Sequence, residues 1–441
     1  MAIHSFDGGT DMAHRTVKSG YASFTERLNR FPQGAPPSDK LFAILKMLID
    51  EREAKLLAQI PIKPFTAEKA ARIWKMDAAS ARRVLDDLAD RAMLVDIERG
   101  GVTRYVLPPP MAGFFEFSLM RVRDDLDQQA LSELFYQYLN VEEDFIKNLF
   151  VDGETHLGRV FVQEPVLTSE AAVHVLDYER ASEVIRTASC IGVGLCYCRH
   201  KMQHLGRACD APLDICMTFN GSAESLTRHG HARRVETAEC LDLLDQAYER
   251  GLVQFGENVR RRVSFICNCC GCCCEALLAA KRFAHLQPVH TTNFIPAVDA
   301  EQCKGCGKCV EACPVDAMSL APAVGRKNPK QETAVLDEIV CLGCGVCVRA
   351  CTKGGLSLRS RPQRVITPET AAHRYVAMAV ERGKLQHLIW DERTLWSHRA
   401  LAAVFGAILK LSPVKRVMAG EQVRSRYLNR LLSSKKATAA S

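Results

Sequence analysis

The chain has 441 residues, of which 47% are hydrophobic and 25% charged, and its formal net charge is +7. This length and composition exclude a disordered or collagen-like protein and predict about three globular domains. No apolar run approaches the roughly 20 residues of a membrane-spanning helix, and the first residues lack the apolar core of a secretory signal, so we expect a cytoplasmic protein.

The first elements along the chain are predicted to be helices. Residues 1–37 form a polar leader with several Gly and Pro residues, which predicts a flexible segment. Apolar residues then recur at helical spacing after Ser38, over residues 66–76, and after a predicted N-cap at Asp77. Residues 94–107 predict a hairpin that turns at Gly100-Gly101.

Three helices followed by a hairpin resemble the winged helix-turn-helix family in order and length, so residues 38–107 are predicted to form a winged-helix-like domain. The resemblance implies DNA binding by the third helix, and a small docking module is the alternative. The third helix carries Arg82 and Arg83, but also Asp86, Asp87 and Asp90. Because these acids would repel phosphates, DNA contact is not favoured.

The middle of the chain, residues 111–298, is predicted to be a mostly helical Cys-rich domain. It follows three consecutive prolines at 108–110, which neither extend a helix nor pair in a central strand. Isolated thiols such as Cys190 and Cys240 are expected to be buried as small hydrophobes. Between the Cys-rich loops, residues 233–254 predict an amphipathic helix that brings these loops together.

The clearest motif is an internal repeat within residues 299–360, the predicted ferredoxin domain. The first copy reads C-x2-C-x2-C-x3-C-P from Cys303 to Pro314, and the same cysteine spacing returns from Cys341 to Cys351. Thr352 stands where the second copy would carry its proline. Three cysteines spaced by two residues can surround one corner of an iron-sulfur cube, and the intervening glycines permit tight turns.

This domain closely resembles the bacterial two-cluster ferredoxins, in which the fourth cysteine of each motif serves the other cluster. Structural zinc and free thiols are the alternatives, but zinc sites favour two separated C-x2-C pairs. The resemblance implies two [4Fe-4S] clusters. Their predicted ligands are Cys303, Cys306, Cys309 and Cys351 for cluster 1, and Cys341, Cys344, Cys347 and Cys313 for cluster 2.

Ten further cysteines fall in two short loops, 196–216 and 267–274. Six cysteines within eight residues cannot all be buried as hydrophobes, so an additional centre is predicted, either a third Fe-S cluster or zinc, with reactive thiols as a further alternative. The candidate ligands are Cys196, Cys198, Cys209, Cys216, Cys267, Cys270 and Cys273.

The patterns C-x-C-R, G-x-x-C-D-x-P-x-x-x-C and C-N-C-C-G-C-C-C within residues 190–360 resemble a group of iron-sulfur proteins of anaerobic and facultative bacteria. This resemblance implies an additional redox centre. Arg199, His200 and His204 are expected to be solvated rather than catalytic. Asp210 and Asp214 are expected to form caps and turns.

The last part, residues 361–441, is predicted to be a basic helical tail, with fifteen Lys/Arg against five Asp/Glu. An apolar stripe of Leu401, Val404, Phe405, Ile408 and Leu409 lies beside the basic residues Arg399, Lys410, Lys415 and Arg416. Such a segment lies on an anionic membrane surface, docks on an acidic partner, or is an ordinary core-facing helix, and the last reading is favoured.

These patterns together predict a multidomain α+β iron-sulfur protein that relays single electrons between a donor and an acceptor enzyme. No Walker loop, Rossmann glycine pattern or flavin motif is present, so redox partner proteins are required, and an electron-transfer protein or redox subunit is favoured over a free-standing enzyme. The alternatives are an Fe-S redox-sensing DNA-binding regulator and a catalytic reductase subunit.

Overall fold

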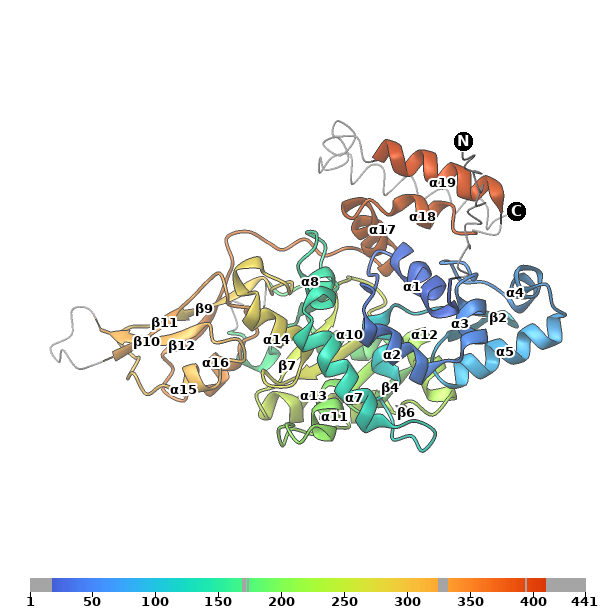
Figure 1. Cartoon of the computed structure of the whole chain (residues 1–441). Helices are drawn as coiled ribbons and strands as arrows, with labels where there is room; N and C mark the ends of the chain where they lie inside the picture. The colour runs from blue at the N-terminus through green and yellow to red at the C-terminus, as the bar shows by residue number, and fades with distance from the viewer. Residues whose placement is uncertain (1–17, 169–171, 173, 324–331, 393–394, 410–441) are drawn as a thin grey trace, which may run out of the picture.

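The protein is seen in a computed structural model that describes residues 18–168, 172, 174–323, 332–392 and 395–409. It mixes helix and sheet, as the sequence predicts. Figure 1 shows four parts: an N-terminal module at the right, a central domain, a ferredoxin-like domain at the left, and tail helices above them.

The N-terminal module consists of helices followed by a hairpin. Its elements are α1 (Gly20–Arg30), α2 (Asp39–Leu48), α3 (Glu51–Leu57), α4 (Ala67–Trp74), α5 (Ala78–Asp90), β1 (Val95–Arg99) and β2 (Val102–Val106). The caps are those expected: the Ser38 side chain accepts a hydrogen bond from the N–H of Leu41, and Asp77 accepts one from Ser80. The strands β1 and β2 pair antiparallel.

Helix α1 lies within the predicted flexible leader, and that prediction is wrong for residues 20–30. Phe24 and Leu28 on this helix are buried in the core. The buried side chain of Arg27 donates hydrogen bonds to the carbonyl oxygens of Ile60 and Pro61 at 2.8 and 2.5 Å. The burial of this apolar face and the two hydrogen bonds of Arg27 hold α1 on the rest of the module.

The central domain is built on a six-stranded antiparallel sheet with the strand order β3-β7-β8-β5-β4-β6. Its strands are β3 (Gly158–Val160), β4 (Ile191–Gly194), β5 (Cys216–Phe219), β6 (Arg233–Arg234), β7 (Val253–Glu257) and β8 (Phe265–Cys269). Its helices are α6 (Phe115–Phe117), α7 (Gln128–Tyr136), α8 (Asp144–Phe150), α10 (Ala181–Thr187), α11 (Tyr197–His204), α12 (Asn220–Arg228), α13 (Thr237–Glu249) and α14 (Glu275–Arg282).

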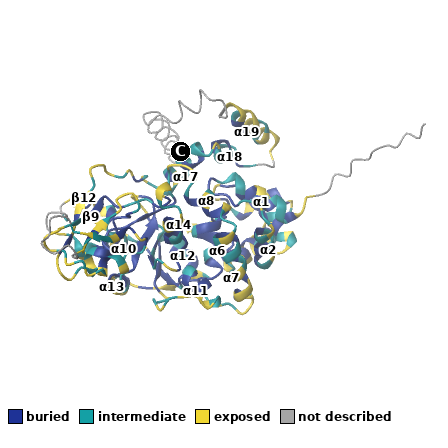
Figure 2. Cartoon of the chain, turned by 60° about the vertical axis from the view of Figure 1, so that its left-hand side comes forward, coloured by how far each residue is buried: buried dark blue, intermediate teal, exposed yellow. Residues whose placement is uncertain are grey.

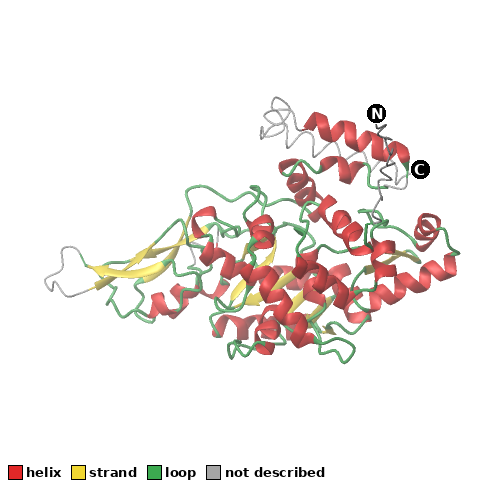
Figure 3. Ribbon diagram, viewed as in Figure 1, coloured by secondary structure: helices red, strands yellow, loops and turns green. Residues whose placement is uncertain are grey.

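The prediction of a mostly helical middle is therefore wrong where this sheet lies. Every residue of β4, β5 and β7 is buried, because helices cover the sheet. Figure 2 shows the strands as buried elements, and Figure 3 shows them surrounded by helices. Strands buried on both faces lack the alternation of apolar and polar residues that identifies a strand in sequence. The predicted amphipathic helix is α13, which buries Cys240 and Leu244.

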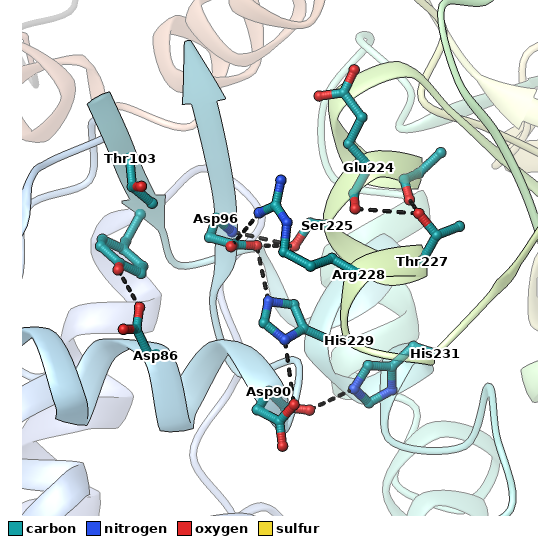
Figure 4. Close-up of polar contacts among 12 residues, drawn as sticks. Asp86, Asp90, Asp96, Thr103, Glu224, Ser225, Thr227, Arg228, His229 and His231 are labelled. Atoms are coloured by element: carbon teal, nitrogen blue, oxygen red, sulfur yellow. Dashed lines mark hydrogen bonds and ion pairs between the residues drawn. The ribbon is translucent and has the colours of Figure 1, made fainter. Parts of the chain in front are cut away.

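A polar contact joins the N-terminal module to the central domain (Figure 4). The Asp96 carboxylate on β1 accepts a hydrogen bond from Ser225 Oγ on α12 at 2.6 Å and forms an ion pair with Arg228. His229 Nε2 lies 3.2 Å from the same carboxylate. Burial alone would raise the pKa of Asp96, but these contacts more than offset it and lower this pKa, and the hydrogen bond that His229 donates to Asp96 raises the pKa of His229. The contact therefore holds β1 against the helix that follows β5.

The ferredoxin-like domain carries the internal repeat into its structure. Its elements are β9 (Phe294–Val298), α15 (Lys308–Glu311), β10 (Met318–Pro322), β11 (Glu332–Leu336), α16 (Val346–Ala350) and β12 (Leu356–Ser360). β9 pairs antiparallel with β12, and β10 pairs antiparallel with β11. α16 and β12 begin 38 residues after α15 and β10, the offset of the repeated cysteines.

The tail forms α17 (Ala371–Glu381), α18 (Leu385–Ile389) and α19 (Trp396–Leu409). Buried Arg374 on α17 forms an ion pair with Glu257 at 2.9 Å, which ties the tail to the central sheet. On α19, Leu401, Val404 and Ile408 are 48%, 61% and 44% exposed, so the core-facing prediction is wrong for these three residues, whereas Phe405 packs against Trp390 as that prediction requires. Lys410, Lys415 and Arg416 lie outside the described residues.

None of the helices in these described ranges combines the length and the apolar character that crossing a bilayer requires.

Candidate metal centres

One group of four cysteines, the outer group, surrounds a small cavity of about 20 Å³. Its members are Cys303, Cys306, Cys309 and Cys351. Cys303 and Cys306 come from the loop before α15, Cys309 lies on α15, and Cys351 follows α16. Gly305 has φ +62°, and a Cβ at this position would lie 2.4 Å from the carbonyl oxygen of Glu332. Only glycine fits such a turn, which folds the loop tightly around the cavity.

A second group, the inner group, surrounds a cavity of about 10 Å³. Its members are Cys313, Cys341, Cys344 and Cys347. Burial raises the pKa of Cys341 to about 11 and that of Cys344 to about 12. Metal ligation requires thiolates, so binding here releases protons. The two cavities thus bring together the two sets of four cysteines implied by the ferredoxin resemblance.

The two groups differ in their access to solvent. Cys306 of the outer group is exposed, whereas Cys341, Cys344 and Cys347 are only 6–8% exposed. Lys304, Lys308 and Lys353 line the outer cavity. The outer group therefore lies at a partly basic surface and the inner group lies inside the molecule.

Residues 302–355 match the family model of the 4Fe-4S dicluster domain. This match implies at least one [4Fe-4S] cluster in the ferredoxin domain and, with it, iron-sulfur electron transfer. No curated protein matches the chain.

At the second motif, where Thr352 replaces the family proline, the backbone N–H of Thr352 donates a hydrogen bond to the Ala350 carbonyl at 3.1 Å. A proline has no N–H to make this contact. The substitution therefore adds a backbone hydrogen bond immediately after Cys351.

Six cysteines of the central domain line one cavity and influence one another's pKa values in a closed sequence, and they are here termed the thiol ring. In order around it lie Cys196, Cys198, Cys274, Cys269, Cys267 and Cys216, and the pKa of each thiol is shifted by the two thiols next to it in this order. All six line one cavity of about 80 Å³ between the sheet and α6, α11 and α14. Hydrogen bonds from Cys216 and Cys269 lower the pKa of Cys267 to about 5.

Glu116 and Arg199 are among the other ionisable side chains that line this cavity. Burial, and then the nearby sulfurs of Cys267, Cys274 and Cys196, raises the pKa of Glu116 well above its usual range. Burial alone would lower the pKa of Arg199, but the thiolates of Cys196 and Cys270 more than offset it and raise this pKa. A fixed cation thus compensates thiolate charge, which suits the site to an anionic metal–thiolate group.

The four remaining cysteines of the two loops form a separate cluster, the four-thiol group. It comprises Cys209, Cys270, Cys272 and Cys273, whose sulfurs all lie within 4.8 Å of one another. The Cys272–Cys273 and Cys273–Cys209 sulfur distances are 3.6 and 3.9 Å. A hydrogen bond from Cys273, assisted by Arg199, lowers the pKa of Cys270 to about 4. One member of the group is therefore a thiolate at neutral pH.

The structure divides the candidate ligands of the additional centre between two places. Cys196, Cys198, Cys216 and Cys267 lie in the thiol ring, whereas Cys209, Cys270 and Cys273 lie in the four-thiol group, and Cys270 also lines the cavity of the thiol ring. The sequence interpretation left out Cys269 and Cys274 of the ring, Cys272 of the group, and Glu116. Sequence proximity of the six cysteines from 267 to 274 was the available signal, but it does not show which sulfurs point to which side.

The nearby polar residues behave differently from one another. Arg199 and His200 are 0% and 5% exposed, so the expectation that they are solvated is wrong. Arg199 donates to the carbonyl oxygen of Asn268 at 2.7 Å, and His200 Nδ1 hydrogen bonds to that of Leu119 at 2.8 Å. Asp210 and Asp214 are exposed, whereas Cys190 and Cys240 are buried in agreement with the prediction.

The ferredoxin domain touches the Cys-rich loop directly. A Cβ on Gly271 would lie 2.4 Å from the carbonyl oxygen of Pro314, the residue after Cys313. The backbone N–H of Gln163 in the central domain also donates to the Cys344 carbonyl at 2.9 Å. The inner group, and not the outer one, therefore faces the ten cysteines of the central domain.

Proposed function

We propose that this chain is an electron-transfer protein that relays single electrons between a donor and an acceptor enzyme. Its proposed cofactors are two [4Fe-4S] clusters on the outer and inner groups and a third Fe-S cluster in the thiol ring. Such clusters, when bound, accept and release electrons one at a time. The observation that carries the proposal is the contact of Gly271 with Pro314, which sets the inner group against the Cys-rich loop.

The exposure and charge of the three cysteine groups indicate where electrons enter or leave the chain. Exposed Cys306 and the lysines at the outer cavity favour a redox partner with an acidic surface, because complementary charge accelerates encounter. The buried inner group is shielded from partners, and the thiol ring lies deeper in the central domain. We therefore assign the outer group to exchange with a soluble partner.

The thiol ring is proposed as the third redox site because six cysteines converge there beside a buried cation. Four thiolates satisfy a cubane, so the ring holds more sulfur than one such cluster needs. Its cavity is about 80 Å³, against about 10 Å³ for the inner group. The additional space suits a small substrate or a larger cluster, and this observation supports the reductase-subunit alternative.

The test is rapid reduction of the anaerobic full chain followed by freeze-quench EPR. We expect a ring signal that develops after the signals of the ferredoxin domain, and a slower ring signal in Cys306→Ala, which removes an outer ligand. Cys240→Ala, a buried thiol outside all the groups, is the matched control. A ring without iron, or one reduced at the wild-type rate when the outer group is disabled, contradicts the relay.

The redox-sensing regulator is the second candidate, and the Asp96 contact favours it. Residues 216–219 form β5, which begins with a ring cysteine and leads into α12, where Ser225 and Arg228 hold Asp96 on the hairpin. A structural change at the thiol ring can therefore reach the winged-helix-like module through β5, α12 and the contact with Asp96. Against this function, Arg82 on α5 is paired with Asp86 at 3.2 Å. A mobility shift with genomic DNA fragments decides, and no affinity at low salt removes this candidate.

We also propose that the exposed stripe of Leu401, Val404 and Ile408 on α19 contacts an anionic membrane surface, since apolar residues beside basic ones suit such a surface. Co-sedimentation with phosphatidylserine vesicles tests this contact. Val404→Asp is expected to abolish it, whereas equal pelleting of the variant contradicts it.

A further inference from the structure

The four-thiol group has the dimensions of a site for one metal ion. We propose that Cys209, Cys270, Cys272 and Cys273 bind a single zinc ion, separate from every iron-sulfur centre of the chain. With Zn–S bonds of about 2.3 Å, tetrahedral geometry places the sulfurs about 3.8 Å apart. The distances of 3.6 and 3.9 Å between Cys273 and its two neighbouring sulfurs agree with this value.

The same comparison excludes a cubane at this group. A cubane keeps its cysteine sulfurs further apart than a single ion does, because four irons and four sulfides lie between them. Within the part of the chain that the structure describes, no other set of three or more His, Cys, Asp or Glu side chains brings its ligand atoms within 4.8 Å. The outer group, the inner group and the thiol ring are therefore wider, as clusters require.

The donor set favours zinc over other divalent ions. Four thiolates close the coordination sphere without an open position, which is the pattern of structural zinc sites, and zinc binds such ligands more tightly than ferrous iron does. Four thiolates and Zn²⁺ sum to −2, and the buried guanidinium of Arg199 beside Cys270 compensates part of this charge. The ion would be redox-inert, so the site does not depend on the electron-transfer proposal.

The position of the group gives the ion a structural task. Cys209 lies in the segment 196–216, which supplies three ring cysteines, and Cys270, Cys272 and Cys273 lie in the segment 267–274, which supplies the other three. One ion on all four sulfurs clamps these two segments together. The zinc site thus fixes the positions of the two segments that supply the cysteines of the thiol ring.

X-ray absorption at the zinc edge of the anaerobically purified full chain tests the proposal without any variant. We expect about one zinc per chain with four sulfur neighbours at about 2.3 Å. Zinc with nitrogen or oxygen neighbours, iron on these sulfurs, or a Cys209–Cys273 disulfide found by mass spectrometry overturns it. Because the readout is zinc, failure of this site leaves the iron of the proposed clusters measurable.

Variants then assign the zinc to these residues. Exposed Cys272 is the substitution least disturbing to folding, and Cys272→Ser is expected to lower zinc at least tenfold while the EPR signals of the ferredoxin domain persist. Cys190→Ala, which changes a buried thiol outside both groups, is expected to retain zinc. Full zinc in Cys272→Ser, or loss of iron without loss of zinc, contradicts the assignment.

Discussion

Replacing Gly271 with alanine tests the junction between the ferredoxin domain and the Cys-rich loop. The added Cβ would lie 2.4, 3.0 and 3.1 Å from the oxygen, Cα and carbonyl carbon of Pro314. Ordinary contact begins near 3.4 Å, so the two backbones must separate by up to about 1 Å. Since all three atoms belong to the backbone, no side-chain rotation relieves the overlap, and overpacking of this kind costs about 1–3 kcal/mol.

Gly271→Ala is therefore expected to lower the free energy of unfolding by about 1–3 kcal/mol and to slow reduction of the thiol-ring centre, with iron content unchanged. Denaturant titration measures the first effect, and freeze-quench EPR measures the second. Gly221→Ala is the control, because its Cβ would meet Ile97 at 3.9 Å, an ordinary contact. Wild-type stability together with wild-type electron transfer in Gly271→Ala would refute the assignment of this junction.

Two further predictions concern crossed ligation and pH. If ligation is crossed, Cys351→Ala and Cys306→Ala each remove a ligand of cluster 1, so the two variants are expected to show the same residual EPR spectrum. If ligation is uncrossed, the spectrum of Cys351→Ala matches that of Cys341→Ala instead. Asp96→Asn is expected to lower the free energy of unfolding by about 1–3 kcal/mol at pH 6. The pKa of His229 is raised in the folded state, so the stability that its ion pair with Asp96 contributes is fully present below the unfolded-state pKa of about 6.5. This stability is lost as the pH rises through the folded-state pKa. The difference in unfolding free energy between Asp96→Asn and the wild type is therefore expected to shrink at pH 9. A deficit independent of pH contradicts that interpretation.

Local chemistry made parts of the fold predictable. Ser38 and Asp77 begin helices because their side chains satisfy backbone N–H groups at the first turn, a signal contained in a few residues. The internal repeat is equally local: its cysteine and glycine spacing requires no knowledge of distant contacts. The structure gathers each set of four cysteines around one cavity, with a cysteine from the other repeat in each.

The central sheet and the division of the ten cysteines were not predictable in the same way. β4 and β5 are four-residue strands buried on both faces, so periodicity alone does not distinguish them from helix. Neighbours in sequence also separate in space: Cys273 joins the four-thiol group and Cys274 joins the thiol ring. The antiparallel pairing of β5 with β8, which brings Cys216 beside Cys267, is a contact between distant parts of the chain that no local pattern indicates.

The most direct test of the account is the iron and acid-labile sulfide content of the full chain purified without oxygen, combined with EPR of the reduced protein. The account predicts about eight irons from the ferredoxin domain and at least about four more from the thiol ring, with matching sulfide and EPR signals from reduced clusters. A colourless protein that carries zinc on the cysteines of the outer and inner groups would contradict it.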